Sequence, residues 1–151
     1  MSETTIFKVA NAFLRREPMT HKKLQKMCYY AYCWYLTLYP GKRLFDNNFE
    51  AWVHGPVDPK LYNKYKEYGW KEIEDFDDED TLGEELESFI DNVMESYGHL
   101  DGDQLEYLTH RELPWKNARG DLPPYEASRN PIMDDDIRGY YSRMIEDGQI
   151  E

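Results

Sequence analysis

Apolar residues recur three or four positions apart through most of this chain, which is the spacing of one face of an α-helix. Polar residues that suit a helix N-cap precede many of these stretches, and Pro or Gly follows several of them. The expected helices cover residues 5–17, 21–39, 59–68, 81–97 and 101–112, with a last helix from residue 134. We therefore predict a mainly α fold, a single compact bundle of about six helices with a small antiparallel strand pair.

The second of these helices is expected to form the axis of the core. One of its stripes steps by four and three residues, and it comprises Leu24, Cys28, Ala31, Tyr35 and Leu38. The opposite side carries further large apolar residues, Tyr29, Tyr32, Trp34 and Leu36. A helix that is apolar most of the way round is normally buried on all sides.

A short alternating pattern predicts the strand pair. Residues 49–53 alternate with the period of two that is typical of a strand, and Trp52 falls on the face away from the inward set. Ile132 and Met133 are expected to pair with this strand. Residues 116–131 hold three prolines and one glycine, so they are expected to form a loop.

Gly55, Pro56 and Val57 follow the strand, and we expect them to form a sharp structural turn. Pro fixes its backbone φ angle, and a Gly-Pro pair is typical of turns. His54 stands beside this turn and is the one candidate for an acid or a base, because histidine titrates near neutral pH. The alternative is that its ring bonds a backbone group and stiffens the turn.

No other motif predicts catalysis. The sequence has no glycine-rich phosphate loop, no nucleophile elbow and no His pair at zinc spacing. The four histidines, His21, His54, His99 and His110, fall in four different elements. We therefore expect no enzyme, no metal and no cofactor, and a small enzyme that uses His54 is kept as an alternative.

Length and charge limit the function further. A chain of 151 residues is expected to form one domain, spanning residues 1–151. The net charge of −12 argues against a general nucleic-acid binder, since binding to phosphates depends on Lys and Arg. Residues 1–71 hold 12 Lys and Arg against 6 Asp and Glu, whereas residues 72–151 hold 6 against 24. This asymmetry predicts a basic and an acidic face, or acids that merely solvate surface helices.

Five basic residues near the first helix junction leave a DNA-binding regulator open as an alternative. They are Arg15, Arg16, Lys22, Lys23 and Lys26. The overall charge and the lack of an attached helix-turn-helix segment weigh against this alternative.

Cysteine use and hydropathy predict a cytoplasmic protein. Cys28 and Cys33 lie five residues apart in a helical segment, so their thiols point about 140° apart and are expected to be separate buried groups in a reducing compartment. No signal peptide is recognisable. The longest uncharged run, residues 27–41, is too short to span a membrane.

Three segments together resemble a known family. They are KLQKMCYYAYCWYL at residues 23–36, FEAWVHGPV at residues 49–57 and THRELPWKNAR at residues 109–119. In this order and at this spacing they resemble the Panacea domain, also described as the SocA-like antitoxin or phage-associated GepA-like family. The second segment, which runs on to Leu61 and Tyr62, is more specific than the first. The resemblance extends over nearly the whole chain.

The resemblance implies a mostly helical antitoxin of a type II toxin–antitoxin pair, which binds a protein toxin directly and blocks it. We expect the toxin to be encoded by a neighbouring gene. SocA-like members resemble adaptors that deliver a toxin to a AAA+ protease, and this is the alternative mechanism. The resemblance supplies no catalytic residue and no cofactor.

The toxin-binding residues are expected among the aromatic and basic side chains of these segments, because such residues dominate protein interfaces. The candidates are Trp52, His54, Tyr62, Trp115 and Arg119. The alternative is that they hold the fold while the toxin binds elsewhere. The acids between Glu72 and Glu87 are expected to suit a basic toxin surface, or to mimic a nucleic acid on which the toxin acts.

Overall fold

The computed structural model describes residues 2–148 and shows a mainly α fold with one small antiparallel sheet, as predicted. The elements in this part of the chain are α1 (Ile6–Arg16), α2 (His21–Leu38), β1 (Glu50–Trp52), β2 (Gly55–Val57), α3 (Pro59–Tyr65), the 3₁₀ helix η1 (Lys66–Tyr68), α4 (Glu84–Tyr97), α5 (Gly102–His110), α6 (Leu113–Arg119) and α7 (Asp134–Glu146). Among the described helices, none has the length and apolar character needed to cross a membrane.

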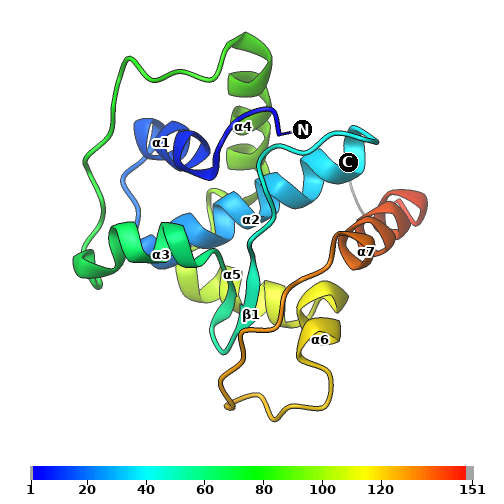
Figure 1. Ribbon diagram of the computed structural model, residues 1–151. Coiled ribbons are helices and arrows are strands. Elements are labelled where there is room, and N and C mark those ends of the chain that lie inside the picture. The colour runs from blue at the N-terminus through cyan, green and yellow to red at the C-terminus, as the bar shows by residue number, and fades with distance from the viewer. Residues whose placement is uncertain (1, 149–151) are drawn as a thin grey trace.

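Helix α2 is the axis of the core, as its sequence predicts. It crosses the middle of the molecule, and the other helices are arranged around it (Figure 1). Residues 23–36 are buried without interruption. Even Tyr29, Tyr30 and Tyr32 have at most 1% of their surface exposed, and their rings pack against other aromatic rings. The core is therefore built largely of tyrosine, whose hydroxyls need partners inside the protein.

Local capping contacts begin several helices where the sequence predicts. The Thr5 hydroxyl accepts a hydrogen bond from the Lys8 amide at the start of α1 (3.3 Å), and Thr20 caps α2 in the same way (3.2 Å). At the start of α5, Asp101 and Gln104 form a reciprocal capping box. These contacts span only three residues, so the sequence alone reveals them.

The two strands form a hairpin whose turn begins two residues earlier than predicted. Trp52 pairs with Gly55, so Val53 and His54 form the turn. Gly55, Pro56 and Val57, expected as the turn, are strand β2 instead. The reason is tertiary, because Gly55 has a φ of +112° and a Cβ at this position would lie 2.9 Å from Cε of Lys26. Only glycine lets the strand approach α2 so closely.

The segment before α7 extends the hairpin. The Ile132 amide donates to the Phe49 carbonyl (3.0 Å), so the predicted pairing of Ile132 with the first strand is confirmed. Met133 does not take part, because it is the N-cap residue of α7 and its side chain is exposed. A second bond, from the Ala51 amide to the Asn130 carbonyl (2.8 Å), fixes the register.

The prediction of a loop over residues 116–131 is wrong in its first part, because α6 runs through Arg119. Pro114 lies in the first turn of α6, where its missing N–H has no intrahelical partner to lose. The proline therefore begins a new helix after α5 instead of ending the ordered structure.

Candidate functional site

Three of the five predicted binding residues lie together on the surface of the hairpin and α3. Trp52 and Tyr62 are half-buried, and their rings meet edge to face with centroids 5.0 Å apart. The Trp52 indole also donates to the Glu50 carboxylate (2.8 Å). His54, at the turn, has 73% of its side chain exposed. We call Trp52, His54 and Tyr62 the hairpin face.

The other two predicted residues, Trp115 and Arg119, lie behind this face and are buried at 7% and 4% exposure. The Trp115 indole donates to the Trp52 carbonyl (2.9 Å), and its ring stacks on His110 with centroids 3.9 Å apart. The Arg119 guanidinium donates to the Ala51 carbonyl (3.0 Å) and lies over the Trp115 ring. Both side chains are engaged within the chain and hold β1 in place.

A polar cluster fills the space between the hairpin, α2 and α5. Glu106 binds both Lys22 (2.6 Å) and the His54 ring (3.2 Å). Lys26 lies beneath Gly55 with only 2% of its surface exposed, and within the described residues no carboxylate comes within 4.0 Å of its amine. Burial, aided by the nearby positive charge of Lys22, lowers the pKa of Lys26 to about 7. The hairpin thus rests on a buried amine that forms no ion pair in the described residues, although the charges of Glu106 and Asp103 oppose part of the pKa shift.

His54 does not have the surroundings that the enzyme alternative requires. That alternative needs a histidine lining a deep pocket, where burial tunes its proton affinity. Instead, His54 projects into solvent at the tip of the turn, and Glu106 is its hydrogen-bond partner. Its position favours recognition of a partner or stiffening of the turn.

A second surface feature is the acidic strap, defined here as residues 72–83. It passes outside α1 on its way from η1 to α4 (Figure 1). The side chain of Asn11 pins it through two bonds, donating to the Asp77 carbonyl (2.8 Å) and accepting from the Asp77 amide (2.7 Å). Near its start, the Ile73 amide donates to the Met19 carbonyl (2.8 Å). The strap is therefore held in a defined path although most of its side chains are exposed.

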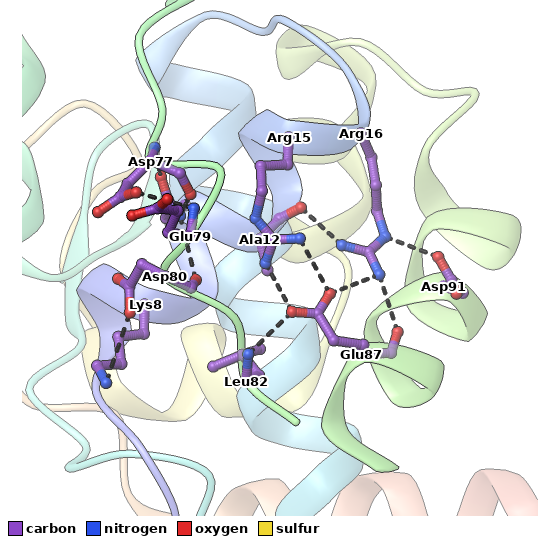
Figure 2. Close-up of polar contacts among 11 residues, drawn as sticks. Lys8, Ala12, Arg15, Arg16, Asp77, Glu79, Asp80, Leu82, Glu87 and Asp91 are labelled. Carbon is purple, nitrogen blue, oxygen red and sulfur yellow. Dashed lines mark hydrogen bonds and ion pairs between the residues drawn. The ribbon is translucent and has the colours of Figure 1, made fainter. Parts of the chain in front are cut away.

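Glu87 fastens the far end of the strap, as Figure 2 shows. Its carboxylate accepts from Arg15 (2.6 Å), Arg16 (2.8 Å) and the Leu82 amide (2.9 Å). Although burial by itself raises the pKa of this carboxyl, the bonds from Arg15, the Leu82 amide and Arg16 lower it to about 2. Arg16 also binds Asp91 on α4 (2.7 Å).

Replacing Glu87 with glutamine is expected to lower the free energy of unfolding by about 1 kcal/mol at pH 7. Because the folded-state pKa is depressed, the carboxylate stabilises the fold above its ordinary pKa of 4.5, and this stability is lost as pH falls toward 2. Urea unfolding at pH 7 and pH 3 measures both effects. Glu95→Gln, at an exposed position of the same helix, is the control. Equal acid sensitivity of Glu87→Gln and wild type would contradict the assignment.

The basic residues on which the DNA-binding alternative rests form contacts within the protein or are buried. Arg15 and Arg16 bind Glu87, Lys22 binds Asp103 and Glu106, and Lys23 binds Glu17 (3.0 Å) and the Gly98 carbonyl (2.6 Å). Lys26 is buried. Apart from the Lys23–Glu17 pair, these contacts join α1 and α2 to α4, its C-cap residue Gly98, and α5 across long sequence distances. The cluster that suggested DNA binding is thus a set of structural contacts.

The cysteines occupy the positions that the sequence predicts. Cys28 and Cys33 are free and buried, and burial raises the pKa of both thiols well above their ordinary value. In the part of the chain that the structure describes, no group of three or more His, Cys, Asp or Glu residues could hold a metal ion.

Sequence reasoning missed the most exposed aromatic residues. Trp70 has 84% of its surface exposed, Tyr125 82% and Tyr107 67%. Trp70 lies in a Gly69-Trp70-Lys71 turn directly before the acidic strap. The sequence signal for exposure of Trp70 is its position, directly after the glycine that ends a helix and before a run of acidic residues.

The fold and these surfaces define a helical domain with a pinned hairpin. The chain belongs to the SocA-like antitoxin family, since the family model described as "Antitoxin SocA-like, Panacea domain" matches residues 24–116. The resemblance to this family is thereby confirmed over residues 24–116, a shorter stretch than the nearly whole chain that the sequence led us to expect. The matched residues include most of α2, the hairpin, α3 to α5 and the start of α6. No curated protein and no solved structure matches the chain.

Proposed function

We propose that this chain, as one domain over residues 1–151, is the antitoxin of a type II toxin–antitoxin pair and neutralises a protein toxin by binding it directly. The observation that carries the proposal is membership of the SocA-like antitoxin family over residues 24–116. An antitoxin family indicates a role in binding and not in catalysis. The exposed hairpin turn supports the same view, because His54 is engaged by Glu106 and faces solvent.

The mechanism that we propose is obstruction of the toxin by a preformed surface. Binding costs less when the binding loops are already ordered, because little conformational entropy remains to be lost. Trp115 and Arg119 hold the hairpin from behind, and Asn11 and Glu87 hold the acidic strap. Both features can therefore meet a partner without rearranging.

The charge of the strap makes a basic toxin surface the proposed partner. Its exposed acids are Glu72, Glu74, Asp75, Asp77, Asp78 and Glu79. Their backbone is fixed by Asn11 and Met19, so their charges are concentrated on one outer face of α1. Such a field accelerates encounter with an oppositely charged surface.

Reversing three of these charges, Glu72→Lys, Glu74→Lys and Asp78→Lys together, is expected to slow association with the toxin at least ten-fold at low salt. The effect should shrink as salt screens the field. Stopped-flow or surface-based association rates across a salt series measure it. The control, Asp121→Lys, Glu126→Lys and Glu146→Lys, makes the same change in net charge away from the strap. An unchanged rate and salt dependence in the strap variant would refute the charge argument.

The proposed function is tested by co-expression with the protein encoded by the neighbouring gene. We expect that protein to be toxic alone, harmless when this chain is present, and to co-purify with it. Repeating the rescue in cells that lack individual AAA+ proteases separates direct neutralisation, which persists, from delivery to a protease, which is lost. Neither rescue nor complex formation would mean that this chain is not the antitoxin of that protein.

A further inference from the structure

We propose that the toxin docks on the groove beside Trp70, and that it inserts a segment in which an apolar side chain is flanked by Lys or Arg. The groove measures about 560 Å³ and lies where three connections meet: the link between α1 and α2, the turn after η1, and the link between α4 and α5. This inference rests on the proposed function, since it names the surface through which the antitoxin would act.

Trp70 is presented at the rim of this groove by a turn that is fixed on both sides. Before it, the Gly69 amide donates to the Lys66 carbonyl (3.1 Å), and after it the Lys71 amide donates to the Tyr68 carbonyl (3.0 Å). The Ile73 amide then ties the chain to Met19 (2.8 Å). An indole with 84% of its surface exposed on such a turn loses little freedom when a partner covers it.

The charges around the groove select a basic partner. Its lining includes two lysines, but Lys22 is paired with Asp103 (2.6 Å) and Lys23 with Glu17 (3.0 Å). Two further carboxylates of the lining, Glu72 and Asp101, form no ion pair within the described residues. The rim therefore carries excess negative charge, which Lys or Arg of a partner would neutralise.

An apolar surface continues from the groove onto α5. Leu100 and Asp103 line both the groove and a shallower hollow that also includes Tyr107 and Leu108. Tyr107 has 67% of its surface exposed, so exposed aromatic rings stand at both ends of this surface. Large exposed apolar groups beside a charged rim are typical of protein interaction sites.

The acidic strap and the groove form one continuous acidic surface. Glu72 lines the groove and is also the first residue of the strap, so Trp70 stands where the two meet. A basic toxin surface that is drawn toward the strap would reach the indole directly. The acids would then steer the encounter, and Trp70 with the groove would supply most of the binding energy.

The test compares Trp70→Ala with Tyr125→Ala in binding to the purified toxin that co-purifies with the wild-type chain. Tyr125 is equally exposed, at 82%, but lies in the loop after α6. We expect Trp70→Ala to weaken binding about 30-fold without changing the melting temperature, because hot-spot truncations cost about 2 kcal/mol or more. Tyr125→Ala should bind as wild type does, and Trp70→Phe should restore most of the affinity.

The possible results separate this inference from the proposed function. If wild type binds and protects while Trp70→Ala binds equally well, the antitoxin role stands and the groove is not the docking surface. If light scattering shows a wild-type dimer that Trp70→Ala dissociates while toxin binding is unchanged, a second copy occupies the groove and the inference fails. If wild type binds no toxin, the proposed function itself fails.

Discussion

Replacing Lys26 with methionine is expected to raise the free energy of unfolding by about 3 to 5 kcal/mol at pH 6. The amine of Lys26 is buried beneath the hairpin, and the neighbouring carboxylates Asp103 and Glu106 are bound to Lys22. A buried charge without a partner is costly, and burial lowers the pKa of Lys26 from 10.5 to about 7. Methionine fills similar space without the charge.

The same substitution should change how stability depends on pH. The folded-state pKa of Lys26 is depressed. The free-energy cost of burying its charge is therefore absent above the unfolded pKa of 10.5, and it grows as pH falls to about 7. The stability advantage of Lys26→Met over wild type should therefore shrink between pH 7 and pH 9.5, by about 1.4 kcal/mol per pH unit at most. Urea unfolding of wild type and Lys26→Met at several pH values measures the difference.

Lys23→Met is the matched control, because Lys23 lies on the same helix but has partners in Glu17 and the Gly98 carbonyl. It should destabilise the fold slightly and leave the slope above pH 7 unchanged. A Lys26→Met variant that is less stable than wild type at pH 6 would show that the amine has a partner and would overturn the argument.

The sequence predicts most of the fold because its strongest signals are local. The caps of α1 and α2 join residues three positions apart, so Thr5 and Thr20 mark the helix starts directly. Helix α6 was missed because its start depends on distant contacts. Glu112, which precedes it, is held by the hydroxyls of Tyr30 and Tyr141, which lie 82 and 29 residues away in the chain.

The candidate site is less predictable, because burial depends on distant partners. Trp70 and Trp115 are the same residue type, yet Trp70 is exposed and Trp115 is buried. Trp115 packs against His110 and Arg119 and donates to the Trp52 carbonyl, 63 positions away. Likewise, Arg15 and Arg16 suggest a basic surface when only the sequence is considered, but in the structure both bind Glu87. Residue type identifies candidates for binding, but packing decides which of them remain free.

The buried carboxyl of Glu112 gives the last prediction. Glu112 is only 4% exposed. One of its carboxylate oxygens accepts hydrogen bonds from the hydroxyls of Tyr30 (3.0 Å) and Tyr141 (2.6 Å), and these bonds join α2 and α7 to the start of α6. Burial raises the pKa of Glu112 to about 7, against the ordinary 4.5, although both tyrosine bonds act in the opposite direction. In the folded state the protonated form is therefore favoured up to about pH 7.

Glu112→Gln is expected to be more stable than wild type by about 3 kcal/mol at pH 8 and nearly equal to it at pH 4.5. Because the folded-state pKa of Glu112 is raised, the stability that its protonated form contributes is complete below pH 4.5 and is lost as pH rises through about 7. Burial lowers the pKa of His21 and His110. These two histidines therefore make stability rise with pH near pH 6, which is opposite to the effect of Glu112. The quantity to measure is therefore the difference between variant and wild type at each pH.

Glu112→Leu separates the charge from the hydrogen bonds. Leucine also removes the charge, but it leaves the hydroxyls of Tyr30 and Tyr141 without their acceptor in the core, which should cost about 2 to 4 kcal/mol relative to Glu112→Gln. If the leucine and glutamine variants were equally stable, the tyrosine bonds would contribute nothing. If Glu112→Gln followed the wild-type pH profile, the carboxyl would be ionised in the fold throughout, and the burial argument would be wrong.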